Sequence, residues 1–217
     1  MPHPTPASSV PRRSRLAVRA TGRLIAALAF TLMSACSTPQ PPATKTVYDF
    51  GLAPTAPGTG AARSTPAPAL LLADVQAPMA LNATAVQYRL SYDNEQELRP
   101  YALARWSMAP AQLVHQRLKL ALNARGPVLA EGQGTPSQAL KIELEEFVQV
   151  FDQPQSSHGR ISLRATLLNG SQLVDQIRVQ ASAVAPSNDA AGGVRALTQA
   201  TDAAALQLLT WLDQQKP

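Results

Sequence analysis

The sequence has little of several residue types on which protein chemistry depends. It contains one cysteine and three histidines in 217 residues, and 15% of its residues are charged, where about 25% is typical. A single cysteine excludes an intramolecular disulfide and any zinc or iron–sulfur site built from several cysteines. The length fits one domain or two small ones. Because the 19 prolines exceed the usual share of about 5%, we expect a globular domain with an extended tail.

Positive charge is concentrated at the N-terminus. Five arginines lie within the first 23 residues, no acidic residue accompanies them, and an apolar run follows over residues 24–33. A run of about ten residues is too short for a bilayer core, which takes about 20, but it is typical of the central region of a signal peptide. Without residues 1–35 the chain keeps 14 basic and 14 acidic residues. The net charge of +5 is therefore a targeting signal, and we expect no binding to nucleic acid.

The apolar run ends at Met33-Ser34-Ala35-Cys36, which resembles the lipobox of bacterial lipoproteins. A signal peptidase needs small side chains beside the cleaved bond, and the lipid transferase needs a thiol just beyond the apolar region. Met33 departs from the usual leucine, and the alternative is an ordinary signal peptide that happens to end near Cys36. We expect Sec export, removal of residues 1–35 and lipidation of Cys36. Ser37, in place of aspartate, favours a lipid anchor in the outer membrane with the domain facing the periplasm.

The mature chain divides into a tether and a domain. Residues 36–45 follow the cleavage point and are rich in Pro, Ser, Thr and Ala, a composition that buries too little surface to fold. We assign them as a flexible tether and residues 46–217 as the domain. A first strand is expected at 47–51, and 53–68 is expected to be a loop before the next strand.

Periodicity predicts the remaining elements. Two amphipathic helices are expected at 109–123, with Arg117 and Lys119 facing out, and over a long C-terminal stretch after Gly192-Gly193. Together with about six strands they predict an α/β or α+β domain. The strands are expected at 70–75, 86–92, 98–106, 140–150, 161–167 and 172–184.

The longest strand has an irregular pattern. Leu144, Val148 and Val150 are expected on one face and Gln149 on the other, but Glu146 then falls on the apolar face. This position predicts an edge or a β-bulge. Asn169-Gly170, between the next two strands at 161–167 and 172–184, predicts a hairpin turn.

No group of residues predicts catalysis. A nucleophile needs a base within reach, and only His115, in a predicted helix, and His158, in a polar loop after Ser156-Ser157, remain after residue 35. The pair Glu143 and Glu145 could do acid–base work, but cross-strand ion pairs with Arg160 and Arg164 explain it more simply. Trp106 and Trp211 are interpreted as core residues rather than as a binding surface. We therefore expect a binding protein, not an enzyme, with no metal and no cofactor.

Six short motifs occur in a characteristic order over residues 46–212. They are Tyr48-Asp49-Phe50-Gly51, Tyr88-Arg89, Tyr101 to Trp106 followed by Pro110 and Leu113, Leu144-Glu145-Glu146-Phe147 with Phe151-Asp152, Arg164-Ala165-Thr166-Leu167, and a closing helix from Ala196 to Trp211. In their order and spacing they resemble the ABC-type transport auxiliary lipoprotein family. The resemblance implies a three-layer α/β/α fold with a mixed sheet and a long C-terminal helix.

The resemblance also implies a role and a partner. It implies a non-catalytic periplasmic lipoprotein that assists an MCE-type ABC transport system in moving lipid between membranes and that binds the MCE-domain protein. Homo-oligomerisation is left open. Glu143 with Glu145 and the 86–106 hairpin are the first surfaces to test for docking. The alternative function is an envelope assembly lipoprotein that serves a secretion or lipopolysaccharide-export machine.

Overall fold

The computed structural model describes residues 44–53 and 67–215. All of them belong to one compact unit, Thr44–Pro217. The predicted signal peptide, Cys36, most of the predicted tether and most of the predicted loop at 53–68 lie outside the described residues.

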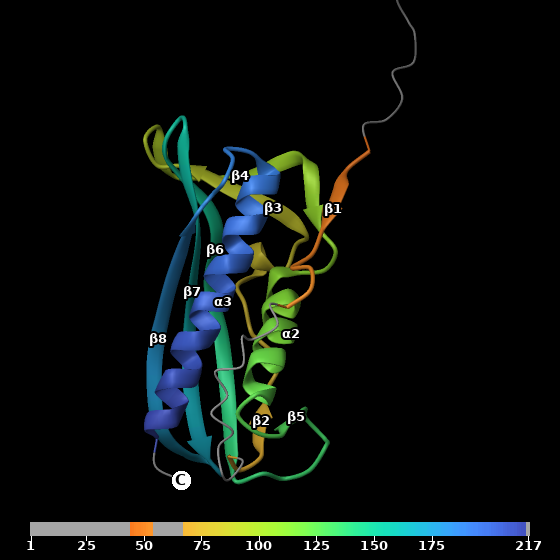
Figure 1. Cartoon of the computed structure of the whole chain (residues 1–217), viewed down its shortest axis with the longest axis vertical. Coiled ribbons are helices and arrows are strands. Elements are labelled where there is room, and N and C mark those ends of the chain that lie inside the picture. The colour runs from red at the N-terminus through yellow and green to blue at the C-terminus, as the bar shows by residue number, and fades with distance from the viewer. Residues whose placement is uncertain (1–43, 54–66, 216–217) are drawn as a thin grey trace, which may run out of the picture. The chain divides into compact units, whose positions relative to one another are not determined.

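The described residues form an eight-stranded mixed sheet (Figure 1). Each predicted strand is present, and alternation of apolar and polar residues accounts for most of them. β3 and β4, β6 and β7, and β7 and β8 pair antiparallel, whereas β1–β4, β2–β5, β2–β6 and β3–β6 are parallel. The strands are β1 (Thr46–Tyr48), β2 (Leu70–Leu72), β3 (Ala85–Leu90), β4 (Asn94–Trp106), β5 (Val128–Leu129), β6 (Gln138–Gln153), β7 (Ser156–Asn169) and β8 (Gln172–Val184).

β6 organises the sheet because it has neighbours along both edges. One edge pairs with β7 over nearly its whole length, and the other pairs first with β2 and then with β3. The register with β7 shifts between Leu144, opposite Leu163, and Glu146, opposite Ser162. Glu145 is therefore the extra residue of a β-bulge. The bulge predicted near Glu146 is confirmed, and it lies where the other edge changes from the β2 segment to β3.

The bulge exchanges the two faces of β6. Beyond it Phe147 lies opposite Ile161, on the same face as Leu144. Gln149 shares that face and is fully buried. The expectation that Val148 and Val150 continue the face of Leu144, with Gln149 opposite, is therefore wrong. It assumes strict alternation along β6, whereas the inserted residue moves every later side chain to the other face.

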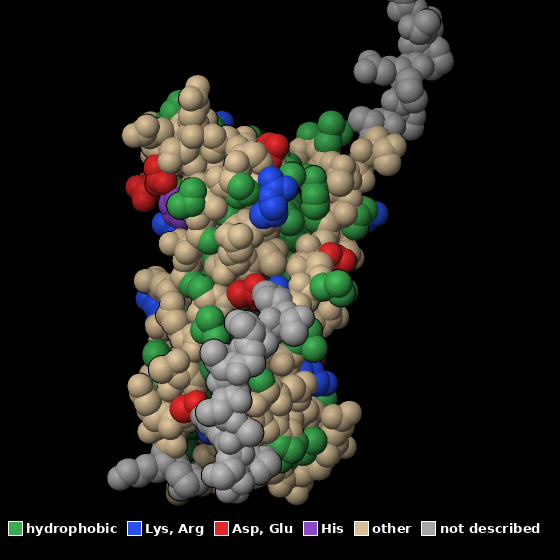
Figure 2. Space-filling model, in the orientation of Figure 1, with side chains coloured by type: hydrophobic (Ala, Val, Ile, Leu, Met, Phe, Trp, Pro, Cys, Tyr) green, Lys and Arg blue, Asp and Glu red, His purple; other side chains and the backbone are tan. Residues whose placement is uncertain are grey.

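Two helices cover one face of the sheet, α2 (Pro110–Asn123) and α3 (Ala190–Gln214), and a short 3-10 helix spans Met79–Leu81. The predicted α/β class, mixed sheet and long C-terminal helix are confirmed. Figure 1 shows α2 and α3 side by side in front of the strands, and Figure 2 shows the side chains on the surface of the same face of the molecule. Both helices contribute to a single apolar core with the inner face of the sheet. The described residues thus form one helical layer, and the second layer that the resemblance implied is not among them.

Arg117 joins the two helices. Its side chain is 5% exposed, and its guanidinium donates from Nε and Nη2 to the two carboxylate oxygens of Asp202 in α3, at 2.5 and 2.9 Å. The expectation that Arg117 faces solvent is wrong. A bidentate pair supplies the partner that a buried guanidinium needs.

The first turn of α3 packs closely on the sheet. Asp189 is the N-cap and its Oδ1 accepts from the Gly192 amide at 2.7 Å. A Cβ on Gly193 would overlap the side chain of Gln149, and a Cβ on Gly159 in β7 would lie 2.5 Å from the Leu197 amide nitrogen. Glycine at these two positions lets α3 approach the sheet closely. For this reason Gly192-Gly193 lies inside the helix, where we had expected it to precede the helix.

We predict that Gly159→Ala destabilises the domain by about 1–3 kcal/mol, because the added methyl group overpacks the contact with α3. Chemical denaturation with circular dichroism measures the free energy of unfolding. Ser156→Ala, at an exposed position of the same strand, is the control and is expected to change stability by less than about 0.5 kcal/mol. Equal stability of the two variants would contradict the close approach.

Candidate docking surfaces

The face of the sheet opposite the helices carries a charged network around the bulge. The Glu145 carboxylate accepts from Arg164 Nη2 at 2.6 Å, from Arg178 Nε at 2.8 Å and from Ser162 Oγ at 3.1 Å. The hydrogen bond from Arg178, supported by those from Arg164 and Ser162, lowers the pKa of Glu145 to about 2. Glu145 therefore stays ionised and is held on three sides by its own domain.

The ion pairs across β6 and β7 differ in detail from the expected ones. Arg164 contacts Glu145 and, at 3.7 Å, Glu143. Arg160 bonds to Glu146 at 2.7 Å rather than to Glu143 or Glu145. The glutamates of β6 therefore form cross-strand ion pairs with arginines, as predicted, and these arginines neutralise the negative charge of this face. Its charge is thus poorly suited to select a partner.

The β3–β4 hairpin presents a different surface. Its outer part, from Asn94 to Leu98, is exposed. Tyr92 in the turn and Leu98 are among the exposed large apolar side chains. The carboxylates of Asp93 and Glu97 flank them and both bond to Arg99.

The base of this hairpin is rigidly attached to β6. The Tyr88 ring lies 4.6 Å from the Tyr101 ring and 5.9 Å from the Phe151 ring. The Tyr101 hydroxyl donates to Gln149 Oε1 at 2.9 Å. The hairpin therefore combines a fixed base with exposed apolar side chains that have polar groups around them, and an apolar centre with a polar rim is the usual arrangement of a protein-binding surface.

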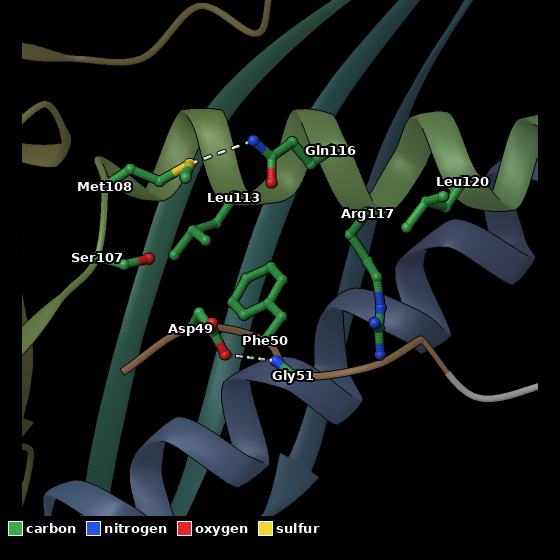
Figure 3. Close-up of a pocket in the computed structure, with 9 residues that line it drawn as sticks. All are labelled: Asp49, Phe50, Gly51, Ser107, Met108, Leu113, Gln116, Arg117 and Leu120. Atoms are coloured by element: carbon green, nitrogen blue, oxygen red, sulfur yellow. Dashed lines mark hydrogen bonds between the residues drawn. The ribbon is translucent and has the colours of Figure 1, made fainter. Parts of the chain in front are cut away.

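The Tyr48-Asp49-Phe50-Gly51 motif lies between α2 and α3 (Figure 3). The Phe50 ring packs edge-on against Trp106 at 5.7 Å and contacts Phe147 at 6.0 Å. The Gly51 amide donates to Asp49 Oδ1 at 2.8 Å, and Gly51 has the positive φ that glycine adopts without strain. In Figure 3 Phe50 points into the space between α2 and the strands.

Two hollows flank this motif. The one on the α2 side has a volume of about 140 Å³, below the roughly 300–1,000 Å³ of ligand sites, and the one on the α3 side, of about 400 Å³, is an open hollow at the surface. Trp106 is 1% exposed and Trp211 is 6% exposed, so both belong to the core as predicted. The motif therefore acts structurally and joins the start of the domain to both helices.

The histidines and serines singled out from the sequence do not form a catalytic group. Ser157 is buried and bonds to Gln149 Nε2 and to Asn188. His158 follows it on the opposite face of β7, where its Nδ1 lies 2.9 Å from Asp152. His115 lines an open hollow of about 650 Å³ beside α2, with Asp74 and Asn82. No serine or threonine hydroxyl of the described residues is bonded to either ring.

Two features are absent from the described ranges, 44–53 and 67–215. Within them no three His, Cys, Asp or Glu side chains are grouped to hold a metal ion. None of the helices in this part is long and apolar enough to cross a membrane. Cys36 lies outside it, so its lipidation stays a prediction.

Sequence reasoning missed the partly buried polar network that connects the hairpin to the segment just before α3. It runs from Tyr101 through Gln149 and Ser157 to Asn188, with distances of 2.9, 2.9 and 3.0 Å. The signal was present in the sequence. If the bulge inferred at Glu146 is used to shift the alternation by one residue, Phe147, Gln149 and Phe151 fall on the core face.

We predict that Glu145→Gln lowers the free energy of unfolding by about 1–3 kcal/mol at neutral pH, because it removes charge-assisted hydrogen bonds. Since the pKa of Glu145 in the folded state lies below its ordinary value of 4.5, at about 2, its stabilisation is present above about 4.5 and is lost as the pH falls towards 2. Denaturation curves from pH 7 to pH 2 measure the difference from the unmodified chain.

Glu143→Gln is the matched control, because that carboxylate is 64% exposed and has one long contact with Arg164. It is expected to have a smaller effect at every pH. A Glu145→Gln difference that does not change with pH would show that the network does not stabilise the ionised form.

Comparisons with known proteins give a family and a fold. A family model described as "ABC-type transport auxiliary lipoprotein component" matches residues 50–208. No curated protein matches. The crystal structure of protein XCC0632 from Xanthomonas campestris, of the DUF330 family, is similar with a TM-score of 0.61 and 21% identity, over 69% of this chain and 87% of that one. A second crystal structure, of an uncharacterized protein, has a TM-score of 0.59 and 15% identity, over 78% and 99%.

At these identities the two structures support the fold alone. The family model, in contrast, extends from Phe50 in the motif between the helices to Leu208 in α3. It therefore includes most of the sheet and both helices, well over half of the chain. The chain belongs to the ABC-type transport auxiliary lipoprotein family.

Proposed function

We propose that this protein is a non-catalytic auxiliary component of an MCE-type ABC transport system for lipid traffic between membranes, anchored in the outer membrane and facing the periplasm. Membership of the ABC-type transport auxiliary lipoprotein family carries the proposal. The contacts made by the candidate nucleophile Ser157 and by His158 support a binding role, because each side chain is engaged by a different group.

A lipid on Cys36 would hold the domain close to the membrane. Nine residues, 37–45, separate Cys36 from β1, and an extended chain spans at most about 3.5 Å per residue, or roughly 30 Å. A triacyl anchor retains the chain durably, since each buried methylene contributes about 0.8 kcal/mol. The partner must then reach the outer-membrane side of the periplasm.

The β3–β4 hairpin is the better of the two candidate docking surfaces. Glu145 is held by three groups of its own domain, whereas Tyr92 and Leu98 are exposed on a ribbon with a fixed base. Aromatic and aliphatic side chains that fill a partner's pocket supply most of the binding energy of such interfaces. The hairpin thus fits an MCE-domain partner with a complementary apolar surface.

We predict that Cys36→Ser abolishes membrane anchoring, because serine cannot accept the diacylglyceryl group as a thioether. The experiment compares labelling with radioactive palmitate and membrane fractionation of the two chains in a Gram-negative host. The variant is expected to lose the label and to move to the soluble fraction. A labelled variant that remains in the membrane would exclude Cys36 as the attachment site.

We predict that the full chain, purified from detergent-solubilised envelopes, brings down an MCE-domain protein and its ABC permease. The double variant Tyr92→Ala with Leu98→Asp is expected to recover about tenfold less, since loss of anchoring side chains costs more than about 1 kcal/mol each. Quantitative mass spectrometry measures the recovery.

Lys141→Ala, an exposed substitution in β6, is the control for this experiment and should leave recovery unchanged. Recovery of secretion, lipopolysaccharide-export or cell-wall proteins without any MCE protein would overturn the proposed function. Unchanged recovery of the MCE-domain protein with the double variant would exclude the hairpin as the docking surface, but it would not contradict the proposed function.

A further inference from the structure

β1 and the last residues of β4 pair at one margin of the sheet, where Figure 1 shows β1 on the right. Their parallel register places Val47 beside Arg105. Trp106, the next residue of β4, is 1% exposed and belongs to the core. Because side chains alternate along a strand, Val47 and Arg105 point away from Trp106. The same register, continued by one residue, places Lys45 beside Leu103.

The four side chains that point away from the core here are exposed. Val47 is 48% exposed and Leu103 is 54% exposed, and Lys45 and Arg105 are exposed as well. Among the described residues neither basic side chain has a hydrogen-bond or ion-pair partner. Two basic and two apolar side chains therefore share one surface, which we call the β1–β4 patch.

Little negative charge lies near this patch. No acidic residue occurs in 75–92 or in 98–130, so β3 and the second half of β4 contain none. Asp49, which follows β1, shares the hollow on the α3 side of its motif with Arg195. On β6, Glu146 is already paired with an arginine. The patch thus keeps a positive charge that its own domain does not neutralise.

The patch also lies close in sequence to the predicted anchor. Lys45 is the ninth residue after Cys36, and nine residues span at most about 30 Å. A domain of this length is about 40 Å across, so the anchor cannot hold it more than one domain diameter from the bilayer. A link this short gives an effective concentration in the millimolar range. Even a weak contact between the domain and the membrane is therefore occupied.

We propose that the β1–β4 patch binds the anionic phospholipid headgroups of the membrane that holds the anchor, so that the domain lies on the bilayer in one orientation. This inference rests on the proposed function, because it requires a lipid on Cys36. Binding to a membrane surface strengthens with the apolar area buried and with the attraction of basic side chains to anionic lipids. Each basic side chain at such a surface raises binding about fivefold, and Val47 and Leu103 supply the apolar area.

This orientation limits the height of the proposed docking surface above the membrane. Leu98 precedes Arg105 by seven residues in β4, and seven residues of a strand span at most about 25 Å. With the patch on the bilayer, the exposed part of the β3–β4 hairpin lies within that distance of the headgroups. The transport partner then has to reach the hairpin in this layer.

The first test measures which side of the domain touches the bilayer. The full chain is extracted from the host membrane in detergent and reconstituted into vesicles of phosphatidylethanolamine and phosphatidylglycerol. Cys36 is the only cysteine, so once it carries lipid, an introduced cysteine is the single site for a fluorophore. Leu103→Cys places the fluorophore in the patch, and quenching by brominated lipids reports contact with the bilayer.

Leu173→Cys is the matched control for the fluorophore. Leu173 is 63% exposed and lies beside the start of β6, whereas β3, the neighbour of β4, lies beside the end of β6. We expect strong quenching at position 103 and weak quenching at position 173. Equal quenching at the two positions, in a chain that floats with the vesicles, would overturn the proposal and leave the anchor intact. A chain that floats with no vesicles would contradict the anchor, and with it both the proposed function and the patch.

The second test asks whether charge selects the orientation. Lys45→Glu with Arg105→Glu is expected to lower the population with the patch on the bilayer about 25-fold, since two attractions are lost. The difference between positions 103 and 173 should then disappear. Phosphatidylcholine in place of phosphatidylglycerol is expected to have the same effect on the unreversed chain.

Lys45→Arg with Arg105→Lys is the control for the charge reversal. It keeps both charges at exposed positions, so the difference in quenching should persist. A difference that survives the charge reversal, or that is the same with phosphatidylcholine, would overturn the proposal. The two basic side chains would then be free to contact an acidic protein surface instead.

Discussion

The extra residue at Glu145 in β6 is the constraint on which the rest of the structure depends. Before the bulge Leu144 faces the helices, and after it Phe147 and Gln149 do. Without the insertion Glu146 would face the apolar core, where an unpaired carboxylate is costly. With it, Glu146 bonds to Arg160 on the outer face, and the core receives an aromatic ring and an amide.

Each residue that the bulge turns inward holds a different part of the domain. Phe147 contacts Phe50 and Trp106, and so joins the motif at the start of the domain to the end of β4. Gln149 bonds to Tyr101 in the hairpin and to Ser157 beside the start of α3. One strand therefore fixes the segment that leads from the predicted anchor, the hairpin proposed for docking and the helix that lies over the β8 edge. This shared support gives the proposed docking surface a defined position relative to β1, near the start of the described domain.

The sequence predicted elements that are determined locally. The strand at 172–184 and the helix at 109–123 follow from alternation and from helical periodicity, and their observed bounds are nearly the same. The predictions were wrong where the position of a residue depends on a contact with a residue far away in the sequence. Arg117 is buried because Asp202, 85 positions away, neutralises it, and no local pattern reveals that partner. α3 begins before its glycines because Gln149 and Ser187 occupy the space that a Cβ would need. For the surfaces, exposure of Tyr92 and Leu98 became visible only once the strands were placed.

The hairpin is the part of the domain that we propose contacts a transport partner, whereas the charged outer face does not. The most direct measurement is photo-cross-linking in living cells, with a photoreactive residue at Leu98 or at Lys141 of the full chain, both of which are exposed. We expect adducts between position 98 and an MCE-domain protein, and none with that protein from position 141. Adducts from position 141 alone, or adducts from position 98 only with proteins outside an ABC transport system, would contradict it.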